Sequence, residues 1–284
     1  MPKRSANDSL MSVIGPKTTA VAVQSNLIVA ENLAAGYRDK TVWQGANFAF
    51  GKGEFIAVIG PNGAGKTTLF RLLLGLQPPI HGMLRIFDEQ PSRGNPRIGY
   101  VPQRHLIDSE TNIESLELVR LGLSGKKWGF NPFEHKDREA AVRALRAVDA
   151  LELAHRPLGV LSGGELQRIF LAEALVSSPE ILLLDEPLSN LDLRRETDLL
   201  HLINKAVREG GVTALLIAHN INPLLPHLDK VMYIANGRVA TGKPSEVLTS
   251  ESLSSLYGMQ VEVLRDPHGN VAIIGVEEHH GDVV

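Results

Sequence analysis

The sequence has no cysteine among its 284 residues, which excludes disulfide bonds and cysteine-ligated metal sites and agrees with a reducing compartment. The formal net charge is only −3 at pH 7, so no general attraction to nucleic acid is expected, although a local basic patch stays open. No apolar run approaches the roughly 20 residues that a membrane-spanning helix requires. There is also no internal repeat and no low-complexity tract. We therefore expect a cytosolic globular protein, for which docking onto a membrane protein stays open.

The first 26 residues have two early basic residues but lack the compact apolar core of a signal peptide. We expect residues 1–26 to form a flexible extension.

Short apolar runs alternate with helical patterns from about residue 27 onward. Strands are expected over 54–60, 83–87, 97–101, 180–185, 213–219 and 230–235, and helices over 66–76 and 195–207. This alternation predicts an α/β fold in which both faces of a sheet are covered.

Residues 105–160 interrupt this alternation. They contain no convincing strand, but 134–151 (EHKDREAAVRALRAVDAL) has apolar residues at helical spacing. We expect a helical subdomain of about 105–160 inserted into the α/β core. The tail adds one expected helix at 250–258 and two weak strands at 260–264 and 271–276.

The segment GPNGAGKT, residues 60–67, matches the phosphate-loop pattern G-x-x-x-x-G-K-[ST] in full. It follows an expected strand and opens an expected helix, a context that disfavours a chance glycine-rich turn. Its glycines let successive N–H groups turn toward phosphate oxygens, Lys66 adds positive charge and the Thr67 hydroxyl can ligate Mg²⁺. We expect this segment to bind nucleotide through Gly60, Pro61, Asn62, Gly63, Ala64, Gly65, Lys66, Thr67 and Thr68.

The segment ILLLDEP, residues 181–187, is an apolar strand that ends in two carboxylates. Burying charge there is costly without a partner. Asp185 is expected to hold Mg²⁺, directly or through water, and Glu186 to polarise an attacking water. The alternative is a pair of strand-end charges that face solvent.

A second helix begins on LSGGE, residues 161–165. Free N–H groups at a helix start bind anions, so this segment looks like a second phosphate cradle. The alternative is a plain serine N-cap.

With these motifs in this order, residues 27–245 resemble the nucleotide-binding domain of ATP-binding-cassette (ABC) transporters. The resemblance implies a phosphate-loop (RecA-like) α/β core of the ABC ATPase type that hydrolyses ATP with Mg²⁺. It also explains the second cradle: Ser162, Gly163, Gly164 and Glu165 of one copy would hold the nucleotide bound to the other copy.

The resemblance assigns four further residues. Tyr37 would stack on adenine, Gln103 would sense the γ-phosphate and Mg²⁺ near the membrane subunit, Asp192 would lie at the dimer interface, and His219 would contact the γ-phosphate. The implied catalytic residues are Glu186, His219, Gln103 and Lys66, and the implied Mg²⁺ ligands are Thr67, Gln103 and Asp185. The sequence departs from the family pattern at two positions: Glu165 stands where glutamine is commoner, and Asn220 stands where aspartate is usual. Neither departure removes a catalytic group.

One phosphate loop and one signature make this chain half of a two-site ATP sandwich. The resemblance therefore implies a second copy of the subunit, separate integral-membrane permease subunits and, indirectly, an extracytoplasmic solute-binding protein, but no nucleic acid. The location implied is peripheral, on the cytoplasmic face of the cell membrane.

Residues 218–264 resemble the branch that imports zinc, manganese or ferrous iron. The iron–siderophore, haem and cobalamin branch shares the ending around 248–258 and stays an alternative. A non-transport ABC ATPase is disfavoured by the single cassette and the lack of cysteine, and a module without turnover is disfavoured by Glu186 and His219.

The C-terminal extension, residues 246–284, ends in GVEEHHGDVV. Glu277, Glu278, His279, His280 and Asp282 suggest a metal sensor, but adjacent histidines point apart and two ligands hold zinc weakly. A solvated tail is the favoured interpretation.

Overall fold

The computed structural model describes residues 26–37, 40–103, 107–108, 110–124 and 134–275. These residues divide into two compact units. The first unit contains Phe50–Phe55 and Ser92–Ala218, and the second contains Ile28–Ala49, Ile56–Pro91 and the chain from His219 onward.

The first unit contains three neighbouring parallel strands, β5 (Ile98–Val101), β6 (Ile181–Asp185) and β7 (Thr213–Ile217). Every residue of β6 and β7 is buried, which explains why both sequences are continuous apolar runs. Helix α6 (Leu193–Arg208) lies between them in the chain and buries Leu199, Leu200, Leu202 and Ile203. The predicted strands and helix are confirmed.

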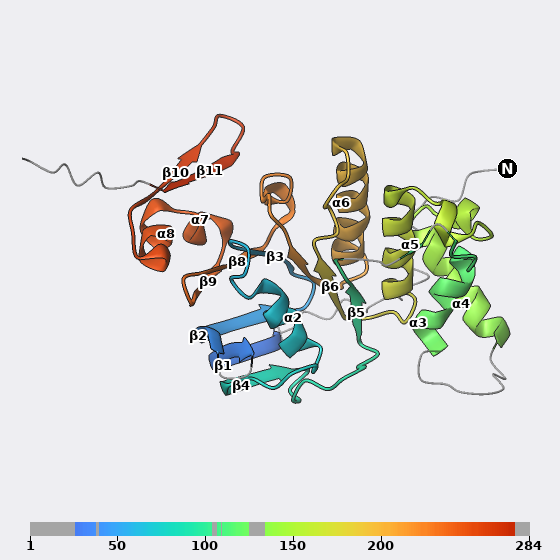
Figure 1. Cartoon of the computed structure of the whole chain (residues 1–284), viewed down its shortest axis with the longest axis horizontal. Coiled ribbons are helices and arrows are strands. Elements are labelled where there is room, and N and C mark those ends of the chain that lie inside the picture. Colours follow the sequence, from blue (N-terminus) through green and yellow to red (C-terminus); the bar gives the residue numbers. More distant parts are fainter. Residues whose placement is uncertain (1–25, 38–39, 104–106, 109, 125–133, 276–284) are drawn as a thin grey trace, which may run out of the picture. The chain divides into compact units, whose positions relative to one another are not determined.

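Helices also make up the part of this unit between β5 and β6. Helices α3 (Ser115–Ser124), α4 (Glu134–Ala147) and α5 (Gly163–Leu175) pack on one another, with the short 3₁₀ turns η1 (Leu151–Leu153) and η2 (Leu158–Val160) before α5 (Figure 1). Gly122 permits the approach of α3, since a Cβ there would lie 2.8 Å from the carbonyl oxygen of Glu173 in α5.

The second unit contains all but the first residue of β3 (Phe55–Ile59). Strand β3 is parallel to β8 (Lys230–Ala235), and β8 is antiparallel to β9 (Arg238–Gly242). Helix α2 (Lys66–Leu73) follows β3. A separate three-stranded sheet has the order β2-β1-β4, formed by β2 (Lys40–Gly51), β1 (Asn26–Tyr37) and β4 (His81–Ile86). The sequence pattern predicts only β4 of these three.

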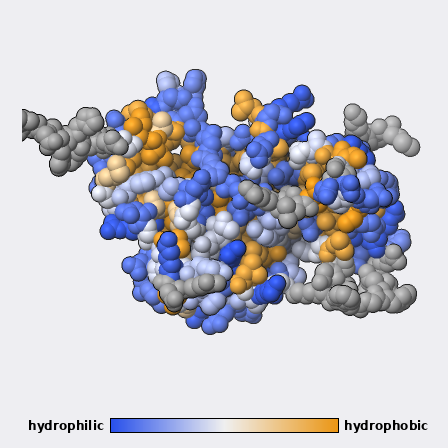
Figure 2. Space-filling view, viewed as in Figure 1, coloured by the Kyte–Doolittle hydropathy of each residue, from blue (hydrophilic) through white to orange (hydrophobic). Residues whose placement is uncertain are grey.

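The C-terminal part of this unit begins with η3 (Leu225–His227), followed after β9 by α7 (Pro244–Val247) and α8 (Ser250–Tyr257). The two strands that the sequence predicts here are present as β10 (Val261–Arg265) and β11 (Val271–Gly275), and they pair as an antiparallel hairpin. Hydrophobic side chains gather over this hairpin, where Leu264 and Ile274 are each 46% exposed (Figure 2). The acidic and histidine-rich segment 277–282 lies outside the described residues.

Candidate functional site

The phosphate loop connects β3 to α2 within the second unit, and its glycines are required sterically. Gly60 has a φ of 145°, and a Cβ there would lie 2.0 Å from the carbonyl oxygen of Ile234. Gly65 has a φ of 99°, and its Cβ would lie 2.7 Å from Val42. Because no side chain fits at either position, the loop holds a turn that only glycine permits.

Lys66 is buried in this loop and holds the loop's own backbone. Its ammonium donates hydrogen bonds to the carbonyl oxygens of Gly60 at 2.8 Å and Pro61 at 3.0 Å. The indole N–H of Trp43 donates to the Gly65 carbonyl at 3.3 Å. No side chain caps the first turn of α2, which includes Thr67, and the backbone N–H groups of a helix start can bind an anion.

Two further predicted residues belong to the same unit. Tyr37 ends β1 and is 59% exposed, so its ring face is accessible. His219 is also exposed and lies two residues beyond the last residue of β7.

In the first unit, the end of β6 brings a buried carboxylate next to a second one. Asp185 is 3% exposed, and Glu186 follows it with a positive φ of 53°. The Glu186 N–H donates to the Ile217 carbonyl at 3.2 Å, and the Gln103 amide donates to the Glu186 carboxylate at 2.5 Å. Gln103 and Glu186 are 83 positions apart in sequence, so the fold joins two predicted site residues.

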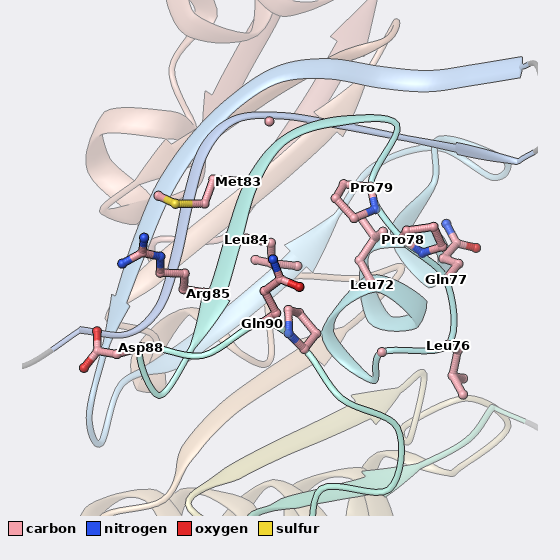
Figure 3. Close-up of a pocket in the computed structure, with 13 residues that line it drawn as sticks. Leu72, Leu76, Gln77, Pro78, Pro79, Met83, Leu84, Arg85, Asp88 and Gln90 are labelled. Atoms are coloured by element: carbon pink, nitrogen blue, oxygen red, sulfur yellow. The ribbon is translucent and has the colours of Figure 1, made fainter.

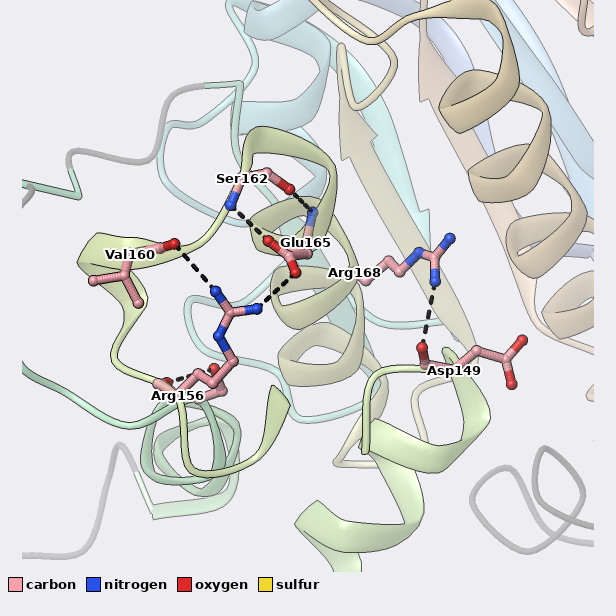
Figure 4. Close-up of polar contacts among 7 residues, drawn as sticks. Asp149, Arg156, Val160, Ser162, Glu165 and Arg168 are labelled. Carbon is pink, nitrogen blue, oxygen red and sulfur yellow. Dashed lines mark hydrogen bonds and ion pairs between the residues drawn. The ribbon is translucent and has the colours of Figure 1, made fainter. Parts of the chain in front are cut away.

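The second cradle begins with a capping box (Figure 4). The Ser162 N–H donates to the Glu165 carboxylate at 2.7 Å, while the Ser162 hydroxyl accepts from the Glu165 N–H at 3.4 Å. Arg156 donates to the same carboxylate at 2.9 Å. The hydrogen bond from the Ser162 backbone lowers the pKa of Glu165, and Arg156 lowers it further.

Glu165 therefore fixes the start of α5. The S-x-x-E spacing would have shown this role in the sequence, whereas the contribution of Arg156 requires the tertiary structure.

The two glycines of this cradle differ in their surroundings. A Cβ on Gly163 would meet nothing within 4 Å, but a Cβ on Gly164 would lie 2.9 Å from Cδ of Arg195. Asp192 caps the next helix: its carboxylate accepts from the Arg195 N–H at 2.9 Å.

The predicted site residues thus fall into two groups. Tyr37, the residues from Gly60 to Thr68, and His219 belong to the second unit, and Gln103, the residues from Ser162 to Glu165, Asp185, Glu186 and Asp192 belong to the first. Hydroxyl, carboxylate and amide oxygens are the hard donors that Mg²⁺ prefers, so the chemistry of Thr67, Asp185 and Gln103 fits this ion.

One cavity lies away from the predicted site residues, beside β4 (Figure 3). It measures about 880 Å³ and contains none of the predicted site residues in its lining. The lining of the cavity includes four consecutive residues of β4, Gly82, Met83, Leu84 and Arg85. Because successive side chains of a strand point to opposite faces, the cavity follows the edge of β4 rather than one face of it.

A glycine-rich loop between a buried strand and a helix, together with a carboxylate pair at the end of another buried strand, defines a phosphate-loop ATPase. Comparison with known proteins makes the class specific. The model of the ABC transporter family matches residues 43–189, and the chain belongs to this family as an ATP-binding subunit. The predicted fold class, ATP binding and ATPase activity agree with this assignment.

The relatives include two curated subunits. The manganese transport system ATP-binding protein MntB of Bacillus subtilis is 33% identical over 83% of this chain and 94% of its own length. The zinc import ATP-binding protein ZnuC of Pseudomonas entomophila is 31% identical over 89% and 96%. A solved inward-facing ABC transporter, assigned to the metal-chelate type, is 30% identical with a TM-score of 0.74, covering 89% of this chain and 99% of its own.

Replacing Glu165 with alanine is expected to lower the free energy of unfolding by about 1 kcal/mol at pH 7, because the capping box and the ion pair to Arg156 are lost. The pKa of Glu165 is lowered in the folded state, so its contribution is present above the ordinary value of 4.5 and is lost as pH falls through the lowered pKa. Urea unfolding of wild type and variant as a function of pH measures this. Glu152→Ala, which removes an exposed carboxylate of the same unit, should show no such pH-dependent difference.

Proposed function

We propose that this protein is the ATP-hydrolysing subunit of a membrane importer for divalent metal ions, zinc or manganese. The observation that carries the proposal is the similarity to MntB and ZnuC along 94% and 96% of their lengths, well beyond the matched family model. The alternative cargo is a metal chelate such as an iron–siderophore complex, haem or cobalamin, which the similarity to a transporter of the metal-chelate type supports.

The working assembly that we propose is a dimer of this subunit on the cytoplasmic face of the cell membrane, docked to permease subunits and served indirectly by an extracytoplasmic solute-binding protein. Residues 27–245 form the nucleotide-binding domain in this proposal, with extensions on either side. Among the described residues, none of the helices has the length and apolar character needed to cross a bilayer.

Each residue of the proposed site has a chemical task. The loop N–H groups and Lys66 bind the phosphates, and Tyr37 stacks on the adenine. Thr67, Asp185 and Gln103 would hold Mg²⁺, which neutralises phosphate charge when bound.

Glu186 orients the attacking water, and its hydrogen bond from Gln103 fixes the direction of its carboxylate. His219 stabilises charge on the transferring phosphoryl group. The N–H groups at Gly163 and Gly164 close over the nucleotide of the partner copy, and Asp192 lies at the interface between the copies.

The cargo is tested by deleting the gene in its native host and measuring cellular zinc and manganese under metal limitation. A fall in one metal that wild-type protein restores, and Glu186→Gln protein does not, supports the proposal. Unchanged zinc and manganese, with lost growth on an iron chelate or on cobalamin, would replace it with the alternative.

Replacing Ser162 with arginine is expected to abolish ATP-dependent dimerisation while ATP binding by the monomer stays within about two-fold of wild type, since the phosphate loop is a separate element. Arginine would project from the start of α5 toward the incoming nucleotide. Titration with a fluorescent ATP analogue and light scattering measure the two properties.

Ser162→Ala is the matched control, because it removes the same N-cap without adding bulk. It should unfold slightly more easily and should weaken dimerisation much less than Ser162→Arg does. Loss of ATP binding in the Ser162→Arg monomer would instead place this segment in the chain's own nucleotide site.

A further inference from the structure

Arg195 lies where two predicted interface elements of the first unit meet. Its Cδ and Nε atoms would lie 2.9 Å and 3.4 Å from a Cβ on Gly164, so its stem covers the backbone of the first turn of α5. Its Nε also lies 3.4 Å from the carboxylate of Asp192, the residue that caps α6. Arg195 thus contacts the LSGGE segment and the segment ending at Asp192 at the same time.

The surrounding cavity shows the same arrangement. It measures about 240 Å³, and its lining includes Ser162, Gly164 and Glu165 from the start of α5 together with Leu191 and Arg195. The contact is therefore a loosely filled space crossed by two long side chains: Arg195 of α6, and Arg168 of α5, which pairs with Asp198 of α6 at 3.5 Å. Arg195 contacts both Gly164 and Asp192, so removing its side chain would loosen the link between the two segments at the starts of their helices.

Electrostatics argues that this placement is not the most stable one available. Arg195 is in the first turn of α6 and beside the first turn of α5, where the partial positive charge of both helix ends disfavours a cation. The ion pair with Asp192 offsets part of this cost but is about half exposed on both sides. A neutral side chain at position 195 would avoid the unfavourable charge, so the stability of α6 alone does not explain the arginine.

We propose that Arg195 is a positioning residue that holds the LSGGE segment and the segment Ser189–Asp192 in a fixed relation, so that both meet the partner copy as one surface. The inference rests on the ATP-sandwich dimer of the proposed function. It assigns Arg195 no contact with nucleotide. It predicts an effect on closure of the dimer and none on ATP binding by the monomer.

The test uses the full-length Glu186→Gln protein, in which the ATP-bound dimer should accumulate. Adding Arg195→Ala should raise the ATP concentration for half-maximal dimerisation about five-fold or more, the size of a modest coupling free energy. ATP affinity of the monomer should not change. Arg194→Ala, which removes an exposed arginine from the adjacent position, is the matched control for charge.

Two variants separate the possible causes. Arg195→Met keeps an apolar stem over Gly164, so it should raise the ATP concentration for half-maximal dimerisation less than Arg195→Ala does. An equal rise in the two variants would assign the positioning role to the guanidinium. Gly164→Ala should also weaken dimerisation, and combining it with Arg195→Ala should cost less than the sum, because the second change removes the atom that the new Cβ meets.

A dimerisation midpoint for Arg195→Ala within two-fold of that for Arg194→Ala would overturn the inference. Failure of the Glu186→Gln protein itself to dimerise with ATP would instead overturn the sandwich on which the inference rests.

Discussion

Glu186→Gln protein is expected to bind ATP with near-normal affinity but to hydrolyse it at least about 100-fold more slowly, the usual effect of removing a group that orients and deprotonates a reacting water. The substitution is nearly isosteric. A glutamine carbonyl can still accept the hydrogen bond that Gln103 donates to Glu186, so the local geometry should persist. The loss should therefore appear in the chemical step alone.

Single-turnover phosphate release and size-exclusion chromatography with ATP measure this prediction. Wild-type protein should elute mainly as monomer during turnover, and the variant should accumulate as an ATP-bound dimer. Glu209→Gln, an exposed carboxylate of the same unit, serves as the control and should behave as wild type. Turnover close to wild type with no dimer would show that Glu186 is not the water-orienting residue.

Lys66→Ala protein is expected to lose ATP binding itself, with an affinity at least about 100-fold weaker, because a charge-assisted contact to phosphate is lost. A second effect adds to the first. The Lys66 ammonium holds the carbonyl groups of Gly60 and Pro61, so the variant also loses the bonds that shape the loop before ATP arrives.

Calorimetric titration with ATP measures the affinity, and thermal unfolding shows whether the variant is folded. Lys52→Ala removes an exposed lysine and should bind normally. A folded Lys66→Ala protein with unchanged affinity but slow hydrolysis would assign the lysine to the transition state alone.

The sequence predicts the buried strands well because their signal is local. All five residues of β3, β6 and β7 are buried, so each strand is a short, continuous apolar run that ends at a turn or a charge. The phosphate loop is predicted for the same reason, because its glycines and lysine are consecutive.

The elements that the sequence does not reveal depend on contacts far along the chain. In β1 the register shifts between Glu31 and Ala34, and Asn32 adopts a φ of 45°, so no regular alternation of apolar residues marks this strand. Helix α3 contains Gly122, which reads as a helix breaker until its contact with Glu173 is known.

The candidate site shows the same division. Short motifs in the sequence predict that Asp185, Glu186 and Ser162 belong to the site. They do not predict the hydrogen bond from Gln103 or the ion pair from Arg156, since partners 83 and nine residues away carry no local pattern.

The open space at Gly163 has a consequence for which substitutions selection would tolerate. Nothing in its own chain lies within 4 Å of a Cβ at this position, and its backbone is that of an ordinary first helical residue, so folding tolerates any small side chain there. At Gly60, by contrast, any other residue would collide with Ile234 of the same chain. This restriction applies to the monomer and to the dimer alike. A mutational scan that scores folding alone should therefore tolerate substitutions at Gly163 and reject them at Gly60. A scan that scores growth should reject substitutions at both positions. The difference between the two scans at position 163 would measure how strongly another molecule constrains the sequence of this one.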